Sequence, residues 1–180
     1  MLTHLCSEGD LEGVKAALQS GVDVNSRDAL GYTGLMRALW KRHTAVASLL
    51  LEQEGIDVNI VARGAETALH EAARHNKTSE CLTILLARPD LTTGVNQKDW
   101  AGQTPLSLAV SRNAMMCVQL LLRDGRTDAN IKDDRMGATP LMLAVKTNHV
   151  DCVELLLADP RVDLMTRDNC KRSKAEVSRW

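Results

Sequence analysis

The chain has 180 residues, which is enough for one ordinary domain or for a short stack of repeats. Hydrophobic residues make up 44% and charged residues 25%, a composition typical of folded globular proteins rather than of disordered chains. The 22 basic and 23 acidic side chains leave a formal net charge of −1, which argues against nucleic-acid binding through bulk electrostatics. No apolar run approaches the roughly 20 residues of a membrane-spanning helix, so no membrane insertion is expected.

Five cysteines occur, and no two of them have a Cys-x-x-Cys spacing: Cys6, Cys81, Cys117, Cys152 and Cys170. An odd number without close pairs predicts free thiols in a reducing compartment rather than a disulfide framework. No two cysteines fall at the short ligand spacings of structural zinc sites, so no metal is expected. The first residues lack the basic and apolar segments of a secretory signal. Together these features favour the cytoplasm, with the nucleus as the alternative.

One short pattern, close to Gly-x-Thr-Pro-Leu, recurs along the chain. Its threonines are separated by 34, 37 and 35 residues and are Thr33, Thr67, Thr104 and Thr139. After each threonine come a short apolar segment, a polar break and a second apolar run that ends in leucines. A threonine side chain caps a helix by accepting a backbone hydrogen bond, and Pro105 and Pro140 suit the first helical position. The pattern therefore predicts a helix that begins after each threonine.

The polar break predicts the turn between two helices. Nine residues beyond the threonines stand Asn76, Asn113 and Asn148, with Gly9 in the first copy, and both residue types tolerate a left-handed helix end. Arg42 departs from this rule. The second helices are followed by extended segments that contain Asp-x-Asn at 23–25, 57–59 and 128–130. The repeating unit is thus helix, turn, helix and extended finger.

These units resemble the ankyrin repeat, most clearly at 67–73, 104–109 and 139–144. The resemblance covers essentially the whole chain and implies a single domain, an all-α ankyrin-repeat solenoid with β-hairpin-like fingers. It places a partial repeat 1 over 1–30 and repeats 2 to 5 over 31–63, 64–100, 101–135 and 136–169. Residues 170–180 are expected to form a partial sixth repeat or a C-terminal cap. Gly64 stands one place early, and extra residues such as those at 54–56 predict bulged loops behind the second helices.

The sequence has no arrangement of residues suited to catalysis. It contains no Gly-rich phosphate loop, nucleophile elbow or zinc-protease motif, so no catalytic residue and no cofactor are expected. Cys81, Cys117 and Cys152 recur on the apolar side of the second helices, which indicates buried thiols between repeats rather than nucleophiles. The resemblance gives His70 a structural role, in which it bonds to backbone and holds neighbouring repeats together. His43 and His149 are expected to be structural as well.

Partners of ankyrin-like stacks dock on the concave face, which is made from finger tips and exposed positions of the first helices. The resemblance therefore implies a partner-binding face formed by Leu30, Tyr32, Trp40, Lys41, Arg63, Arg74, His75, Trp100, Gln103, Arg112, Arg135, Met136 and Lys146. Ala29, Glu66, Ser111 and Ala138 map to exposed positions of the same face. The family also includes members hydroxylated at the Asn of the finger, which makes Asn25, Asn59 and Asn130 candidate acceptors.

This face is predicted to be basic and to carry apolar anchors. Large apolar groups stand on the finger tips at Leu30, Trp100 and Met136, and Glu66 is the one acid set against six basic residues. Compensating acids fall in or after the second helices: Glu52, Glu54, Glu80, Asp151, Glu154 and Asp159. Because aromatic and Arg side chains are enriched among interface hot spots, the pattern favours an acidic protein or peptide with some apolar content.

The function expected from these features is protein–protein recognition by an adaptor, inhibitor or targeting module that is monomeric in isolation and not an enzyme. One alternative is a regulatory segment of a larger enzyme, channel or ubiquitin-ligase subunit. Another is a structural or self-associating spacer. A third is that the basic stripe is an ordinary solvated face. RNA is a weaker rival as a partner, because the chain has no overall basic excess.

Overall fold

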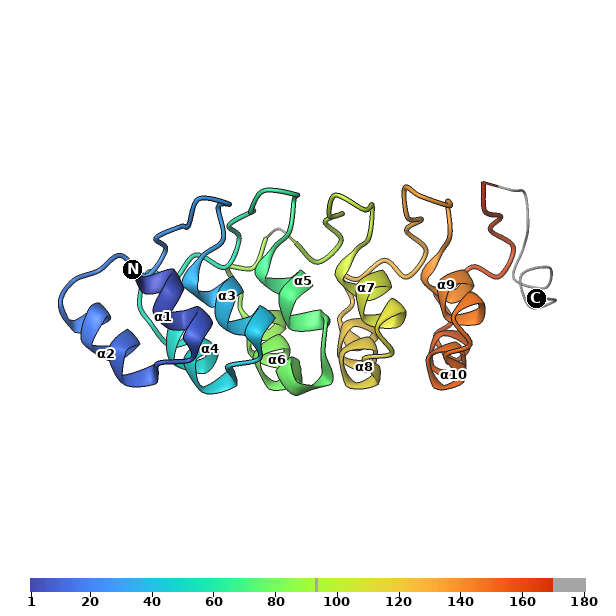
Figure 1. Cartoon of the computed structure of the whole chain (residues 1–180). Coiled ribbons are helices and arrows are strands. Elements are labelled where there is room, and N and C mark those ends of the chain that lie inside the picture. Colours follow the sequence, from blue (N-terminus) through green and yellow to red (C-terminus); the bar gives the residue numbers. More distant parts are fainter. Residues whose placement is uncertain (93, 170–180) are drawn as a thin grey trace.

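The computed structural model describes residues 1–92 and 94–169, which form a row of helix pairs (Figure 1). The helices are α1 (Leu2–Glu8), α2 (Leu11–Gln19), α3 (Gly34–Lys41), α4 (Thr44–Leu51), α5 (Ala68–Ala73), the 3₁₀ helix η1 (Asn76–Thr78), α6 (Ser79–Ala87), α7 (Pro105–Ser111), α8 (Met115–Arg123), α9 (Pro140–Lys146) and α10 (Val150–Ala158). Successive pairs follow one axis, and the fingers between them project to the same side (Figure 1). The odd-numbered helices are the first helices of the pairs and pack side by side. The even-numbered helices are the second helices and form a parallel row of their own.

The recurring threonines begin the first helices, as the sequence predicts. Thr33, Thr104 and Thr139 are the N-caps of α3, α7 and α9, and each hydroxyl oxygen accepts a hydrogen bond from the backbone N–H three residues on. Pro105 and Pro140 are the first residues of α7 and α9, where a missing N–H has no intrahelical partner to lose. The pattern that reveals the repeats is therefore also the physical signal that starts their helices.

Most first helices end in a left-handed residue, as predicted. The φ angles are 76° at Gly9, 53° at Asn113 and 57° at Asn148. Arg42 takes the same conformation, with φ of 66°, although its Cβ makes that conformation unfavourable. The turn lets the following residue donate a backbone hydrogen bond back into the helix, as His43 does to Ala38 at 2.8 Å.

The end of α5 differs from the others, so the expectation of a left-handed Asn76 is wrong. Asn76 instead begins η1. The Thr78 hydroxyl donates to the carbonyl oxygens of Ala72 and His75, both at 2.6 Å. In the other repeats the carbonyl equivalent to that of Ala72 accepts a backbone hydrogen bond at the left-handed turn, as Ala38 does from His43. The Asn76 side chain accepts a hydrogen bond from the backbone N–H of Met116 at 3.0 Å. A side chain thus replaces the backbone bond at this turn.

The core is one continuous layer of apolar side chains that runs through all the helix pairs. Four free thiols are buried in it, at Cys6, Cys81, Cys117 and Cys152. Cys117 donates to the His75 carbonyl oxygen at 3.4 Å, and Cys152 donates to the Asn113 side chain at 3.3 Å. Each of these contacts reaches the preceding repeat, which confirms that the second-helix thiols pack between repeats.

The fingers contact one another through their backbones. Three N–H groups, those of Arg63, Trp100 and Asn169, donate to the carbonyl oxygens of Leu30, Gly64 and Met136 at 3.0, 2.7 and 2.9 Å. The approach is close because a glycine faces the next finger: a Cβ on Gly102 would lie only 2.3 Å from the backbone nitrogen of Asp134. The fingers therefore form a continuous edge above the first helices.

The finger before α5 keeps the register of the finger before α3. Isolated antiparallel bridges join Arg27 to Thr33 and Val61 to Thr67, with the same separation along the chain. Gly64 has φ of 94° and Ala65 has φ of 60°, so two successive residues turn the tip. The early glycine is thus accommodated locally, without a shift of the following helix.

The bulged loops lie behind the second helices, as expected, for example after α4 at 52–56. The expected partial repeat or cap over 170–180, together with Cys170, lies outside the described residues. In the part of the chain that the structure describes, no helix is long and apolar enough to cross a membrane.

Candidate partner-binding face

The side formed by the first helices and the finger tips carries the residues predicted for the concave face, and we keep that name for it. Eight of them are exposed: Leu30, Trp40, Lys41, Arg63, Trp100, Arg112, Arg135 and Lys146. Five are partly buried: Tyr32, Arg74, His75, Gln103 and Met136. Two neighbours expected to be exposed, Glu66 and Ala138, are buried. The set therefore divides into accessible groups and groups that serve the fold.

Two tryptophans provide the main accessible apolar surface of this face. Trp100 is 76% exposed, although its backbone bonds to Gly64 and a Cβ on Gly64 would lie 3.3 Å from its ring. Trp40 is 45% exposed on α3, and Leu30 is exposed to the same extent on its finger. Trp100 thus packs along the neighbouring finger and still presents most of its ring to solvent.

Arg37 organises the aromatic side chains near α3, and the sequence did not single it out. Its guanidinium carbon lies 4.3 Å from the ring centroid of Tyr32 and 5.5 Å from that of Trp40. Its Nε donates to Asp28 at 2.7 Å. The Lys41 ammonium lies 4.8 Å from the Trp40 centroid. The sequence signal for this cluster is that Arg37 stands at a position where α7 and α9 have Leu108 and Leu143.

Arg74 is not a free cation, which corrects the expectation that it is exposed. Its side chain is 16% exposed, and its nitrogens lie 3.1 Å from carboxylate oxygens of both Glu66 and Glu71. Glu66 is 8% exposed and Glu71 is 2% exposed, and the Tyr32 hydroxyl donates to Glu66. Burial raises the pKa of both carboxyls, against the opposing effect of the Arg74 charge. Arg74 therefore neutralises buried acids and serves the fold.

A second set of basic groups lies at the C-terminal ends of the first helices. We call it the cationic row, and it consists of Lys41, Arg42, His75, Arg112 and Lys146. Among the described residues, no ion pair engages its two lysines or its two arginines. The Lys146 ammonium instead donates a hydrogen bond to the Met136 sulfur, with 2.8 Å between Nζ and Sδ. The row thus offers several cations without partner carboxylates.

His75 lies close enough to arginines of three repeats for their charges to act on its imidazole. Burial lowers the pKa of His75 most, and the positive charges of Arg42, Arg74 and Arg112 lower it further. These three arginines come from three successive repeats and directly follow α3, α5 and α7. Their fields therefore overlap at one imidazole between them.

The acids predicted to compensate the basic face do lie in or after the second helices, at Glu52, Glu54, Glu80, Asp151, Glu154 and Asp159. Glu80 is closer to the row than expected, because it lines a hollow of about 510 Å³ together with Arg42, Thr44, Asn76 and Ser79. A charge reversal at Glu80 would therefore be a poor negative control in an experiment that tests binding to the concave face. Arg123 on α8 is exposed and faces the second-helix side, so it is a better one.

His70 has the structural role that the resemblance implies. Its Nδ1 accepts a hydrogen bond from the Thr67 backbone N–H at 3.3 Å, so the ring proton is on Nε2 and is donated to the Gln103 carbonyl oxygen at 3.1 Å. Burial lowers the pKa of His70 and keeps the ring neutral. The other two histidines that were predicted to be structural bond to carbonyl oxygens of the preceding repeat, His43 to Ser7 at 3.0 Å and His149 to Val110 at 2.9 Å.

An asparagine in each finger ties that finger to the next. The Asn25 amide donates to the Gly55 carbonyl oxygen at 2.7 Å and accepts from the Asp57 N–H at 2.8 Å. The same two bonds recur at Asn59, Asn96 and Asn130. Asn96 was not predicted, because Gly94 replaces the aspartate of the motif. The three candidate hydroxylation acceptors thus use both polar atoms of the amide within the fold.

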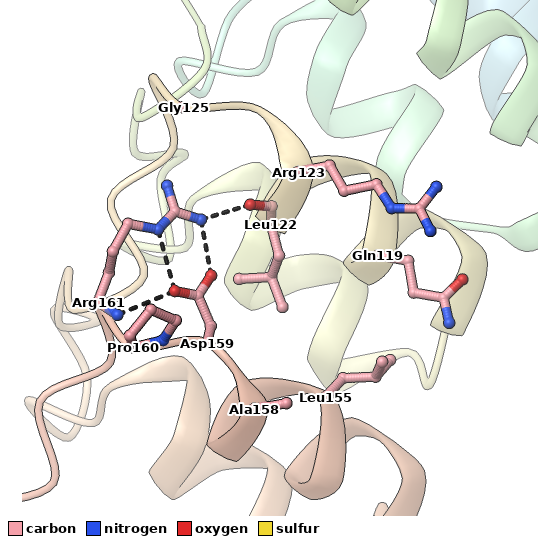
Figure 2. A pocket seen from close by; sticks show the side chains of 9 residues that line it. All are labelled: Gln119, Leu122, Arg123, Gly125, Leu155, Ala158, Asp159, Pro160 and Arg161. Carbon is pink, nitrogen blue, oxygen red and sulfur yellow. Dashed lines mark hydrogen bonds and ion pairs between the residues drawn. The ribbon is translucent and has the colours of Figure 1, made fainter.

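A groove of about 590 Å³ lies on the second-helix side, between the C-terminal ends of α8 and α10 (Figure 2). Arg161 lies beside it, paired with Asp159 at 2.7 Å and donating to the Leu122 carbonyl oxygen at the end of α8. Arg126 does the same for α6, through Leu86 at 2.7 Å. These arginines cap a neighbouring helix. In the described residues, no three His, Cys, Asp or Glu side chains gather as a metal-binding group.

The family model of ankyrin repeats (3 copies) matches residues 2–99 and 69–168, so the chain belongs to the ankyrin-repeat family. The predicted all-α ankyrin solenoid is thereby confirmed. Proteins of this family are generally interaction modules and typically non-catalytic.

Two kinds of curated relative match the chain. A probable E3 ubiquitin-protein ligase XBOS32 of Oryza sativa subsp. japonica is 32% identical over 162 residues, which cover 73% of this chain and 32% of the relative. The neurogenic locus notch homolog protein 1 of Mus musculus and of Rattus norvegicus is 36% identical over 124 residues, which cover 62% of this chain and 5% of the relative. The chain therefore spans about a third of the rice relative and about a twentieth of the Notch relatives.

Proposed function

We propose that this chain is an adaptor, inhibitor or targeting module that binds an acidic, partly apolar protein segment on its concave face. The observation that carries the proposal is the cationic row, whose lysines and arginines have no ion-pair partner among the described residues. Exposed aromatic surface at Trp40 and Trp100 lies on the same face.

Charge segregation supports an acidic partner. The chain as a whole has a net charge of −1, yet the buried acids Glu66 and Glu71 are already paired with Arg74, and other acids lie by the second helices. The concave face therefore presents an excess of positive charge. Such a face attracts an acidic partner over long distances and raises its association rate.

Apolar anchors support a partner that is not purely acidic. An exposed Trp that becomes buried in a complex removes a large apolar surface from water, and Trp is enriched among hot spots. Trp100 is 76% exposed, compared with 45% for both Trp40 and Leu30, so it offers the largest exposed fraction among these apolar side chains. It is therefore the residue that best fits the role of anchor.

The test is selection of a random-peptide library on the immobilised chain. The enriched peptides are expected to be acidic and to contain apolar residues, and the double variant Arg63→Glu/Arg112→Glu is expected to lose them. The matched control is Arg123→Glu, which changes an exposed arginine on the second-helix side. Neutral or basic enriched peptides, or loss of binding in Arg123→Glu alone, contradict the proposal.

The rice relative favours a second candidate, in which this chain is the recognition segment of a ubiquitin ligase. A transcript that encodes this chain together with a ligase domain, and ubiquitin transfer by its product in a purified reaction, test this candidate. Transfer to a substrate that binds the concave face supports it. A product that binds such a substrate without any ubiquitin transfer contradicts it.

We also propose that the chain acts as a monomer in the cytoplasm, with the nucleus as the alternative. Four buried free thiols suit a reducing compartment. Light scattering at two concentrations tests the monomer, since a mass that rises with concentration indicates self-association. A fluorescent fusion tests the compartment.

A further inference from the structure

The cationic row has a regular spacing that restricts the shape of its partner. Its members stand at the ends of α3, α5, α7 and α9, which pack side by side in that order. Packed helices lie about 8–10 Å apart. The row therefore presents one basic position about every 8–10 Å along a line across four repeats.

An extended peptide matches this spacing. A polyproline II segment has three residues per turn and rises 3.1 Å per residue, so every third side chain recurs after about 9 Å on the same side. One of its three sides can face the cationic row, a second can face the exposed ring of Trp40, and the third stays in water.

An α-helical partner matches the row less well. Seven residues of helix also rise about 10 Å, but a straight helix rotates by about 20° with each heptad. Over three intervals the rotation reaches about 60°, and acids spaced by seven residues turn away from the row. The three-residue period of an extended segment keeps its acids in line at every repeat.

We propose, on the basis of the function proposed above, that the cationic row binds an extended partner segment with an acidic side chain at every third position. The acids face Lys41 and Arg42 in repeat 2, Arg112 in repeat 4 and Lys146 in repeat 5.

Repeat 3 interrupts the row electrostatically. Arg74, the arginine nearest to His75, is already neutralised by Glu66 and Glu71 at 3.1 Å. His75 itself stays uncharged near neutral pH, because burial and the neighbouring arginines lower its pKa. The acid that faces repeat 3 therefore meets less positive charge than the others. The partner segment is expected to need that one acid least.

The test uses fluorescein-labelled synthetic peptides of identical composition and measures their dissociation constants by anisotropy. One peptide has four glutamates at every third position, and a permuted peptide has the same four glutamates in one block. We expect the permuted peptide to bind about tenfold more weakly, because several individually weak ion pairs lose their register together. Replacing each glutamate by glutamine in turn is expected to leave one inner position nearly without effect.

The variants separate this proposal from the one on which it rests. Arg112→Gln is expected to weaken the spaced peptide several-fold, and Arg123→Gln is the matched control on the other side. Equal binding of both peptides, with both sensitive to Arg112→Gln, overturns the spacing and leaves the acidic-partner function standing. Binding of the spaced peptide that is insensitive to Arg112→Gln, or a uniform glutamine scan, also overturns the spacing. If neither peptide binds and library selection yields no acidic sequences, both proposals fail.

Discussion

His70 joins two repeats through a ring that must stay neutral. Its Nδ1 accepts from Thr67 and its Nε2 donates to Gln103, so a second ring proton would break the bond to the Thr67 N–H. Because burial lowers the folded-state pKa of His70 below its ordinary value of 6.5, the unfolded chain binds this proton more readily. Stability from this group is therefore complete above about pH 6.5 and falls as the pH drops below it.

We accordingly predict that His70→Gln flattens the pH dependence of stability. The fall in melting temperature between about pH 7.5 and about pH 5.5 is expected to shrink by about half in this variant. Differential scanning calorimetry at both pH values measures it. The control is His4→Gln at an exposed position of α1. An unchanged pH dependence in His70→Gln would show that other groups set it.

Thr127 is a buried residue whose hydroxyl has no hydrogen-bond partner among the described residues. Thr127 directly precedes Asp128, and the equivalent position is apolar in other repeats: Val22 precedes Asp23 and Val162 precedes Asp163. Thr127→Val removes the cost of an unpaired buried hydroxyl and keeps the shape of the side chain. We predict an increase of about 1 kcal/mol in the free energy of unfolding, or about 2–4 °C in melting temperature.

The contrast for Thr127 is Thr104, a buried threonine whose hydroxyl caps α7 by accepting from Ser107. Thr104→Val is expected to lower the free energy of unfolding by about 1 kcal/mol. Thermal unfolding of both variants tests the pair. A loss of stability in Thr127→Val comparable to that in Thr104→Val would refute our account of the Thr127 hydroxyl.

At the residue scale, the sequence predicted roles that the repeat fixes by position. The thiols of Cys117 and Cys152 and the bonds of His70 follow from where these residues stand in the unit. The ion pairs of Arg74 were not predicted, because they depend on the burial of both Glu66 and Glu71. Spacing along the chain does not decide whether these side chains point to the core or to solvent. The available signal was Glu71, a charged residue at a position where repeats 4 and 5 have Leu108 and Leu143.

At the scale of the element, three arginines in the loops after second helices donate to carbonyl oxygens at the ends of neighbouring helices: Arg88 to Leu51, Arg126 to Leu86 and Arg161 to Leu122. Arg126 donates to Leu86 at 2.7 Å and to Leu91 at 3.3 Å, and it pairs with Asp124 at 2.6 Å. It thus places a cation at the negative end of α6. Because the planar fork makes several bonds at once, lysine cannot replace it.

We predict that Arg126→Lys lowers the free energy of unfolding by about 1 kcal/mol despite keeping the charge. Urea denaturation measures it. The matched control is Arg123→Lys on α8, where the arginine has no ion pair among the described residues. Full stability in Arg126→Lys would mean that charge alone, and not the fork geometry, holds the helix end.

Arg42 combines a strained backbone with a place in the cationic row. Its φ of 66° costs a residue with a Cβ about 1 kcal/mol, whereas Gly9 takes the same conformation without that cost. We predict that Arg42→Gly raises the free energy of unfolding by about 1 kcal/mol and weakens binding of acidic peptides. The control Asn148→Gly, at the equivalent position of repeat 5, keeps the charge and is expected to leave binding unchanged. A variant that is stabilised yet binds fully would remove Arg42 from the row.

Element boundaries were predicted where a single local signal decides them. The threonine caps begin α3, α7 and α9 because the capping hydrogen bond is made within the same turn. The end of α5 was not predicted, because two side-chain hydrogen bonds take the place of the left-handed turn there. The Thr78 hydroxyl donates to the Ala72 carbonyl oxygen, and the Met116 N–H donates to the Asn76 side chain. The second bond comes from another repeat and cannot be read from local sequence.

At the scale of the whole molecule, the chain is a line of units in which each repeat mainly contacts its neighbours. The finger asparagines, the loop arginines and the histidines His43, His70 and His149 all bond across one repeat boundary. Such a stack fixes the order and spacing of its first helices. It thereby brings scattered basic residues of a nearly neutral sequence onto one face, which composition alone does not reveal.

The central claim is that this face recruits an acidic partner. Long-range attraction acts on association, whereas buried anchors act on dissociation, so Trp100→Ala is expected to speed dissociation and not to slow association.

The most direct measurement is the association rate constant of the best library-selected peptide, followed by stopped flow over a range of salt concentrations. For the unchanged chain and for Arg123→Glu, we expect fast association at low salt that slows steeply as salt is added. For Arg63→Glu/Arg112→Glu, we expect slower association with a flatter salt dependence. Identical rates and salt dependence in all three proteins would contradict the claim that the concave face binds through its charge.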